Sequence, residues 1–184
     1  MKKFLLILIC FFHINLYAEE NKKVYFAGGC FWCMEESFDK VDGVISVVSG
    51  YSGGHLKNPT YKDVCTETTG HAEAIEILFD PSRVSYRELL ECFFQIHDPT
   101  TIDRQGNDIG DSYRSHIFTT SSEQREEAFK MISDIESSKK WPGKIVTKVT
   151  PAEEFWEAES YHQDYLVKNP NGYTCHFPRA DWTI

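Results

Sequence analysis

The stretch KKVYFAGGCFWCMEESFDKV, residues 22–41, joins a β-rich segment to a helical one through two glycines. The side chains of residues 22–27 alternate in character and are of types that favour β-structure, which is typical of a strand. Gly28 and Gly29 interrupt this alternation, and residues 30–40 then place apolar side chains at helical spacing. The stretch therefore predicts a strand that runs directly into a helix, with a cysteine at the junction.

Further strands and helices are predicted along the rest of the chain. Strands are predicted at residues 43–54, 71–80, 113–120 and 144–152, and helices at 85–98, 122–139 and 155–169. A long loop covers residues 99–112, and the tail from residue 170 is irregular. This order predicts an α+β fold with a split βαβ (ferredoxin-like) plan, a mixed sheet backed by helices in a single domain.

The first eighteen residues, MKKFLLILICFFHINLYA, have the pattern of a secretory signal peptide. Two lysines precede an apolar run at residues 4–12, which is too short for a stable membrane span. We expect cleavage after Ala18 and export of residues 19–184, most simply to the periplasm, without stable membrane association. An uncleaved membrane anchor is the alternative.

Charge and cysteine content exclude several classes of protein. The full chain has 19 basic and 28 acidic residues, a net charge of −9, and loss of two lysines with the signal peptide gives 17 − 28 = −11. This acidity argues against nucleic acid as a partner. Five cysteines remain after cleavage, so they cannot all pair internally: Cys30, Cys33, Cys65, Cys92 and Cys175.

Cys30 opens the predicted helix directly after the glycine turn. Free backbone N–H groups and the positive end of the helix dipole converge there, which predicts a lowered thiol pKa and a nucleophilic thiolate. The alternative is an ordinary glycine turn with Cys30 as a buried apolar side chain. The local pattern does not decide between the two.

Cys30 and Cys33 also have C-x-x-C spacing, which has three interpretations. The second thiol can resolve a mixed disulfide, as in thioredoxin-type motifs. The pair can be half of a zinc site, but Cys65 and Cys92 stand alone, so no second ligand pair is visible and no metal is expected. In the third interpretation, Cys33 is incidental.

Four other residues attract attention by their surroundings. Glu73 lies in an otherwise apolar strand, which predicts a buried carboxyl with a raised pKa; an outward-facing carboxylate is the commoner alternative. Tyr61 lies shortly before it, and Asp108 and Tyr113 lie in or beside the long loop, where functional residues are frequent.

Six strings in this order resemble one family: GGCFW, GYSGG, TGHAEA, DPTTIDRQGNDIGDSYRS, FWEAESYHQDY and GYTCHF. Together they resemble type A peptide methionine-sulfoxide reductases from about residue 23 to the C-terminus. The resemblance implies the same split βαβ fold. It also implies reduction of the S-epimer of methionine sulfoxide, free or in oxidised proteins, and hence protein repair.

The resemblance assigns a role to each matching residue. Cys30 matches the nucleophile, Glu73 the acid that protonates the sulfoxide oxygen, and Cys175 the resolving cysteine on a mobile tail. The substrate-binding residues are those expected around the S-methyl group and the oxygen: Phe31, Trp32, Tyr61, Asp108 and Tyr113. A cysteine sulfenic acid and an intramolecular disulfide then carry the electrons, so no metal, flavin or nicotinamide cofactor is expected.

Cys33 is the departure from the family pattern, since many members have glycine there. It can resolve Cys30 directly, relay the disulfide to Cys175, or be idle; we expect Cys175 to resolve first because its tail is more mobile. Cys65 and Cys92 are expected to be buried or non-catalytic. A thioredoxin-like protein is the expected reductant, and the enzyme is expected to be a monomer.

Two other functions are compatible with parts of the sequence. A disulfide oxidoreductase would work through Cys30 and Cys33, but Trp32 lies inside the pair rather than before it. A secreted binding module held by disulfides would need evenly paired thiols, which the odd cysteine count argues against.

Overall fold

The computed structural model describes residues 20–184. The predicted signal peptide, residues 1–18, lies outside the described residues. Within residues 20–184, no helix is long and apolar enough to cross a membrane.

A six-stranded mixed sheet forms the centre of the molecule, in the order β7-β6-β1-β3-β2-β8. The strands are β1 (Lys22–Gly28), β2 (Val44–Ser52), β3 (Ala72–Phe79), β6 (Ser115–Thr119), β7 (Lys148–Pro151) and β8 (Trp156–Glu157). Only β6 and β7 pair in parallel; the other neighbours are antiparallel. A separate hairpin joins β4 (Arg104–Gln105) to β5 (Asp108–Ile109).

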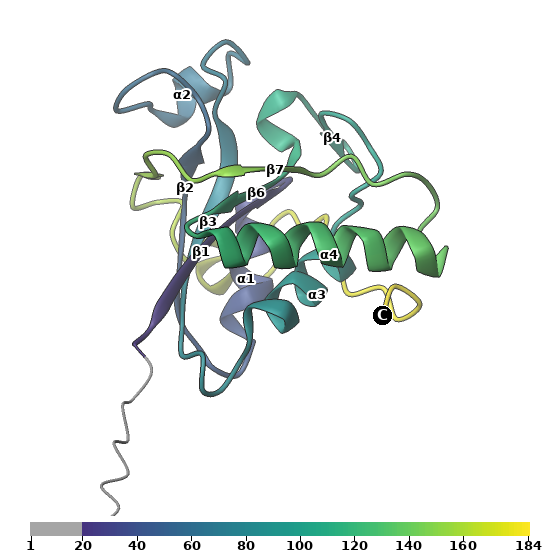
Figure 1. Cartoon of the computed structure of the whole chain (residues 1–184). Coiled ribbons are helices and arrows are strands. Elements are labelled where there is room, and N and C mark those ends of the chain that lie inside the picture. The colour runs from purple at the N-terminus through teal and green to yellow at the C-terminus, as the bar shows by residue number, and fades with distance from the viewer. Residues whose placement is uncertain (1–19) are drawn as a thin grey trace, which may run out of the picture.

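The three longer helices, α1, α3 and α4, back this sheet, and α4 lies across it in Figure 1. The helices are α1 (Phe31–Asp39), α2 (Tyr61–Val64), α3 (Tyr86–Ile96), α4 (Ser122–Ser138) and α5 (Tyr165–Lys168), with a 3-10 helix at Asp111–Tyr113. Ser85 caps α3 by accepting from the Glu88 N–H, while the Glu88 carboxylate accepts from the Ser85 N–H, so this predicted capping box is confirmed.

The order β1-α1-β2-β3-α3-β6 confirms the predicted split βαβ plan. In the sheet these strands lie in the order β6-β1-β3-β2, which brings the two crossover helices to the same face. β7 and β8 then extend the two edges. The fold therefore places β1 and β3, the strands before Cys30 and around Glu73, side by side at the centre.

The two faces of the sheet are packed differently. Large apolar side chains from α1, α3 and α4 form one continuous core on the helical face, including Phe38, Phe93 and Met131. Alanines dominate the smaller cluster on the other face, where Phe155 packs against them. Burial of the helical face supplies most of the driving force for folding.

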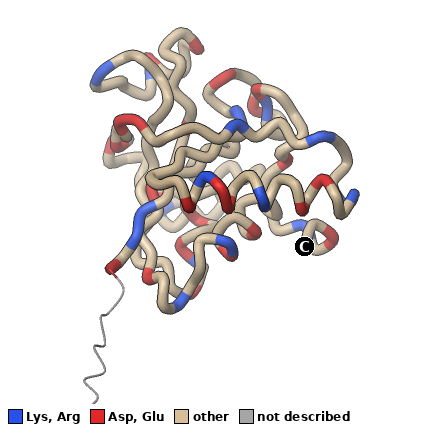
Figure 2. Tube along the Cα trace, viewed as in Figure 1, with Lys and Arg blue, Asp and Glu red and all other residues tan. Residues whose placement is uncertain are grey.

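Residues of both charge signs occur along α4 (Figure 2). Arg87 on α3 reaches across to two acids of α4, at 2.8 Å from Glu127 and 3.0 Å from Asp134. These partly exposed pairs align the two helices over the core.

The predicted helix at residues 155–169 is wrong. Only α5 is helical there, because the preceding chain bonds to the edge of β2 instead of to itself: the Gln163 side chain accepts from the Ser49 N–H and donates to the Ser49 carbonyl, both at 2.9 Å. The predicted strand at 144–152 is shorter than expected, and α2 and the β4–β5 hairpin were not predicted.

Candidate active site

Cys30 lies at the junction between β1 and α1, as the sequence predicted. It is the N-cap of α1, and its side chain is 7% exposed. Gly29 before it has φ of +103°, and a Cβ there would lie 2.5 Å from the Gln105 side chain. Only glycine therefore permits this sharp turn with the hairpin packed against it.

Glu73 lies on the adjacent central strand β3 and is 3% exposed. Its Oε2 accepts a hydrogen bond from the Phe31 backbone N–H at 3.0 Å, which ties the carboxyl to the first turn of α1. Burial raises the pKa of Glu73 to about 8 despite this hydrogen bond. The prediction of a buried carboxyl with a raised pKa is confirmed, and the outward-facing alternative is wrong.

A cavity of about 220 Å³ opens between these two residues. Its lining residues are Cys30, Phe31, Trp32, Tyr61, Glu73, Asp108, Tyr113 and Tyr173. The fold thus brings seven of the nine predicted site residues to one cavity, from segments that are far apart in sequence. Cys33 and Cys175 do not line it and lie together beside it.

The aromatic wall of the cavity is held rigidly. Trp32 stacks on Tyr165, with ring centroids 3.8 Å apart and planes inclined by 13°. The Trp32 indole N–H donates to His162 Nδ1 at 3.1 Å. A methyl-sized apolar group can pack against such a fixed surface.

Two tyrosine hydroxyls complete the polar side of the cavity. Burial, followed by the charge of Glu73, raises the pKa of both Tyr61 and Tyr113 well above the usual value. Both hydroxyls therefore stay protonated at neutral pH and can donate hydrogen bonds to an oxygen bound in the cavity.

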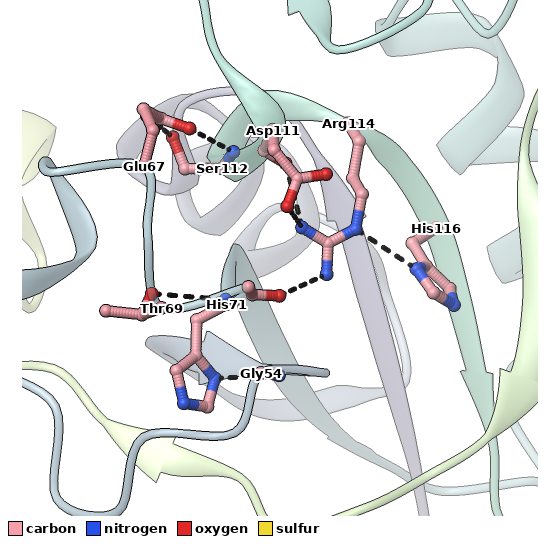
Figure 3. Close-up of polar contacts among 9 residues, drawn as sticks. Gly54, Glu67, Thr69, His71, Asp111, Ser112, Arg114 and His116 are labelled. Atoms are coloured by element: carbon pink, nitrogen blue, oxygen red, sulfur yellow. Dashed lines mark hydrogen bonds and ion pairs between the residues drawn. The ribbon is translucent and has the colours of Figure 1, made fainter.

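A polar network fixes the turn that carries Tyr113 (Figure 3). Arg114 donates to the Asp111 carboxylate at 3.0 Å and to the Gly70 carbonyl at 2.9 Å, which joins this turn to the start of β3. The Glu67 carboxylate accepts from the Ser112 N–H at 2.9 Å and from its hydroxyl at 2.6 Å. The loop therefore has a defined position relative to Glu73.

His71 orders the loop after β2 in the same network (Figure 3). Its Nδ1 accepts from the Gly54 N–H at 3.1 Å, so its Nε2 is the donor to the Leu56 carbonyl at 2.8 Å. This glycine-rich loop leads to α2, whose first residue is Tyr61. His71 thus belongs to the scaffold of the site and does not line the cavity.

Cys33 and Cys175 lie in contact beside the cavity. Their sulfur atoms are 3.6 Å apart, and the Cys175 backbone N–H donates to the Cys33 sulfur at 3.2 Å. All five cysteines of the described chain are free thiols. A modest movement of the tail would bring these two sulfurs to bonding distance, about 2 Å.

The thiol pKa values differ from the prediction made for Cys30. A hydrogen bond with Cys33, burial and the charge of Glu73 raise the pKa of Cys30, in that order of size. Hydrogen bonds from Cys175 and Cys30 lower the pKa of Cys33. The prediction of a lowered pKa at Cys30 is therefore wrong for the resting protein. The sulfur in the first turn of α1 that accepts hydrogen bonds is that of Cys33.

Neither of the two remaining cysteines lines the cavity. Cys92 is partly buried and packs against the core, and burial raises its pKa to about 11. Cys65 is exposed, so of the two expectations for it, burial does not hold.

Several residues that shape the site were not predicted from the sequence. Glu159 accepts from the Tyr51 hydroxyl and the Tyr61 N–H, both at 2.9 Å, and so fixes α2. His162 lies in a turn and accepts the hydrogen bond that holds the Trp32 indole. Tyr173 lines the cavity from the tail, where no periodic pattern marked it.

Comparisons with known proteins agree on one family. Residues 22–182 match the family described as "Peptide methionine sulfoxide reductase". A peptide methionine sulfoxide reductase MsrA of Nocardia farcinica is 57% identical over 165 residues, which cover 90% of this chain and 95% of that protein.

Solved structures agree with the sequence comparison. Mxr1 from Saccharomyces cerevisiae in reduced form has a TM-score of 0.82 at 37% identity, covering 86% of this chain and 92% of that one. Mxr1 in complex with Trx2 has a TM-score of 0.60 at 25% identity, covering 91% and 96%. The chain belongs to the peptide methionine sulfoxide reductase family and is an oxidoreductase of its MsrA type, a peptide-methionine (S)-S-oxide reductase.

Proposed function

We propose that Cys30 and Glu73 act together on a methionine S-sulfoxide, free or in a protein, bound in the 220 Å³ cavity. The observation that carries this proposal is the state of Glu73. A carboxyl that is 3% exposed, with a pKa raised to about 8, lines the same cavity as a cysteine. Near neutral pH it holds the proton that a sulfoxide oxygen requires.

The cavity walls suit the two ends of the sulfoxide group. The S-methyl group packs against the aromatic wall of Phe31 and Trp32. The oxygen points to Glu73 and accepts hydrogen bonds from Tyr61 and Tyr113. Discrimination of a methyl-sized group in such a pocket is worth about 1–3 kcal/mol.

The first step transfers oxygen from the substrate to Cys30. The Cys30 sulfur attacks the sulfoxide sulfur and forms an S–S bond, while Glu73 gives its proton to the oxygen and the thiol proton passes to the thiolate of Cys33. The S–O bond breaks and releases the oxygen as hydroxide, which adds to the Cys30 sulfur; the S–S bond then breaks, methionine leaves, and Cys30 becomes a sulfenic acid. Methionine sulfoxide is reduced by two electrons and Cys30 is oxidised by two.

The second stage recycles Cys30 through the other two cysteines. Cys33 attacks the sulfenic acid and releases water, giving a Cys30–Cys33 disulfide. Cys175 then attacks Cys33, giving a Cys33–Cys175 disulfide and freeing Cys30. The 3.6 Å contact between Cys33 and Cys175 supports this order. It replaces our sequence-based preference for Cys175 as the first resolver.

A thioredoxin-like dithiol then reduces the final disulfide. The similarity to Mxr1 in complex with Trx2 supports a reductant of this class. We further propose that the enzyme is a monomer, exported after cleavage at Ala18, which would place its reductant in the same compartment. Protein repair there follows from these proposals.

Single-turnover reduction of a dabsylated methionine sulfoxide tests the function. Prereduced protein should convert the S-epimer and leave the R-epimer unchanged, and Cys30→Ser should convert neither. Equal conversion of both epimers, or conversion by Cys30→Ser, would refute the proposed site. A disulfide oxidoreductase would instead oxidise reduced unfolded proteins without consuming sulfoxide.

A further inference from the structure

We propose that the reduced protein binds one Zn²⁺ ion through Cys33, Cys175 and His176. The three possible ligand atoms lie within 4.8 Å of one another, and this is the one such cluster of three or more in the described part of the chain. Cys33 comes from the first turn of α1, whereas Cys175 and His176 come from the C-terminal tail.

The distances among these atoms fit a tetrahedral ion. Zn–S bonds of about 2.3 Å place two thiolate ligands about 3.8 Å apart, and a thiolate and an imidazole nitrogen about 3.5 Å apart. The two sulfurs are 3.6 Å apart, and Cys175 Sγ lies 3.1 Å from His176 Nδ1. The third pair, Cys33 Sγ and the His176 imidazole, lies within 4.8 Å, so the site forms when the tail moves closer to Cys33.

The histidine is already held with its free nitrogen toward the sulfurs. His176 Nε2 lies 2.6 Å from the Gly28 carbonyl oxygen, which can only accept, so Nε2 carries the proton. Nδ1 is then the lone-pair nitrogen, and it faces Cys175. An imidazole fixed through its second nitrogen by a carbonyl is the usual support of a zinc ligand.

The surroundings suit a cation with two thiolate ligands. Cys33 is 1% exposed and His176 is 8% exposed, so the site is sheltered on the protein side. The Asp108 carboxylate lies 3.5 Å from Cys175 Sγ and can hydrogen-bond a water in the fourth position. Two thiolates neutralise the ion, and sulfur and imidazole donors favour Zn²⁺ over Mg²⁺ or Ca²⁺.

Sequence spacing alone could not show this site. Cys30-x-x-Cys33 lacks a second ligand pair at zinc-finger spacing, which is why no metal was expected. The fold supplies the pair Cys175-His176 from the opposite end of the chain, across the glycine turn.

Bound zinc would inhibit turnover of the reduced enzyme. The ion uses Cys33 and Cys175, so neither thiol can resolve a sulfenic acid, and a Cys33–Cys175 disulfide in turn removes two ligands. This inhibitory consequence rests on the proposed function, whereas the binding itself does not.

Titration of the fully reduced protein with Zn²⁺ against a chromophoric chelator tests binding, and Co²⁺ reports the geometry. We expect one ion per chain and the intense visible bands of tetrahedral Co²⁺ with thiolate ligands. His176→Gln, whose amide can still donate to Gly28, should weaken binding at least about tenfold. The controls His55→Gln and Cys65→Ser alter an exposed histidine and an exposed cysteine and should bind normally.

The outcomes separate binding from function. Absence of stoichiometric binding, or binding unchanged in both Cys175→Ser and His176→Gln, would overturn the site. Turnover of the wild type with a thioredoxin system should fall when Zn²⁺ is added and recover when a chelator is added. The fall should be smaller in His176→Gln, because this variant binds zinc more weakly. Tight binding without inhibition would overturn the inhibitory role alone. Failure of the metal-free wild type to reduce sulfoxide would count against the proposed function and leave the zinc site standing.

Discussion

The cavity and the tail beside it are built from different kinds of structure. Cys30 and Glu73 sit on the central strands and the start of α1, and both are at least nine-tenths buried. Cys175 sits on an irregular segment with no helix or strand after α5. In the proposed mechanism, oxygen transfer accordingly uses groups with fixed geometry, whereas the recycling thiol moves between its sulfur partners and a reductant.

Cys30→Ser should produce the largest loss, on the cavity side of this comparison. Without the attacking sulfur, methionine formation in a single turnover should fall by more than about 10⁴-fold. Chromatography of the product after rapid mixing measures it. If Cys30→Ser kept more than a small fraction of the rate, another thiol would have to be the nucleophile.

Glu73→Gln should follow, with a loss of about 10²- to 10⁴-fold in the same single turnover, because the amide cannot supply the proton. The matched control is Glu35→Gln. Glu35 is also buried, accepts from the Ser49 hydroxyl at 3.1 Å, and has a pKa raised by burial to about 7, but it does not line the cavity. Equal losses in both variants would make the effect one of folding rather than of chemistry.

Cys175→Ser should leave the single turnover intact and reduce thioredoxin-supported turnover at least about tenfold, because only recycling needs the tail. Cys33→Ser should instead leave a Cys30 sulfenic acid that dimedone traps. Mass spectrometry of both variants after one equivalent of sulfoxide distinguishes them. A trapped sulfenic acid in Cys175→Ser, with none in Cys33→Ser, would reverse the order of the two resolving steps.

The dependence of stability on pH should give the smallest effect. The folded pKa of Glu73 is about 8, against an ordinary value of 4.5, so the folded state favours the protonated form. This contribution is fully present below pH 4.5 and is lost as the pH rises through about 8, a change of a few kcal/mol at most. Chemical denaturation between pH 6 and 9 should show a shallower decline in Glu73→Gln than in the wild type, and parallel curves would contradict the assignment.

The sequence predicted the cavity side well because its signals are local. Alternation in β1 and β3, the glycine turn and the helical spacing after Cys30 all follow from short-range backbone preferences. The otherwise apolar surroundings of Glu73 along its strand correctly indicated burial. Periodicity therefore placed Cys30 at the start of a helix and Glu73 within a strand before any tertiary contact was known.

The tail side could not be predicted in the same way. Residues 155–169 have helical composition, but Gln163 and Ala158 bond to the edge of β2, a tertiary contact that overrides local preference. The meeting of Cys33 with Cys175 joins residues 142 positions apart, with no periodic pattern between them. The thiol pKa order likewise depends on this contact, which reversed the expectation for Cys30.

The protonation state of Glu73 is the central claim, and infrared titration of the reduced protein measures it directly. In a Glu35→Gln background, the band of a protonated buried carboxyl should persist at pH 7 and disappear as the pH rises through about 8. The same band should be missing when Glu73→Gln is added. A carboxyl at Glu73 that is already ionised at pH 6 would contradict the account.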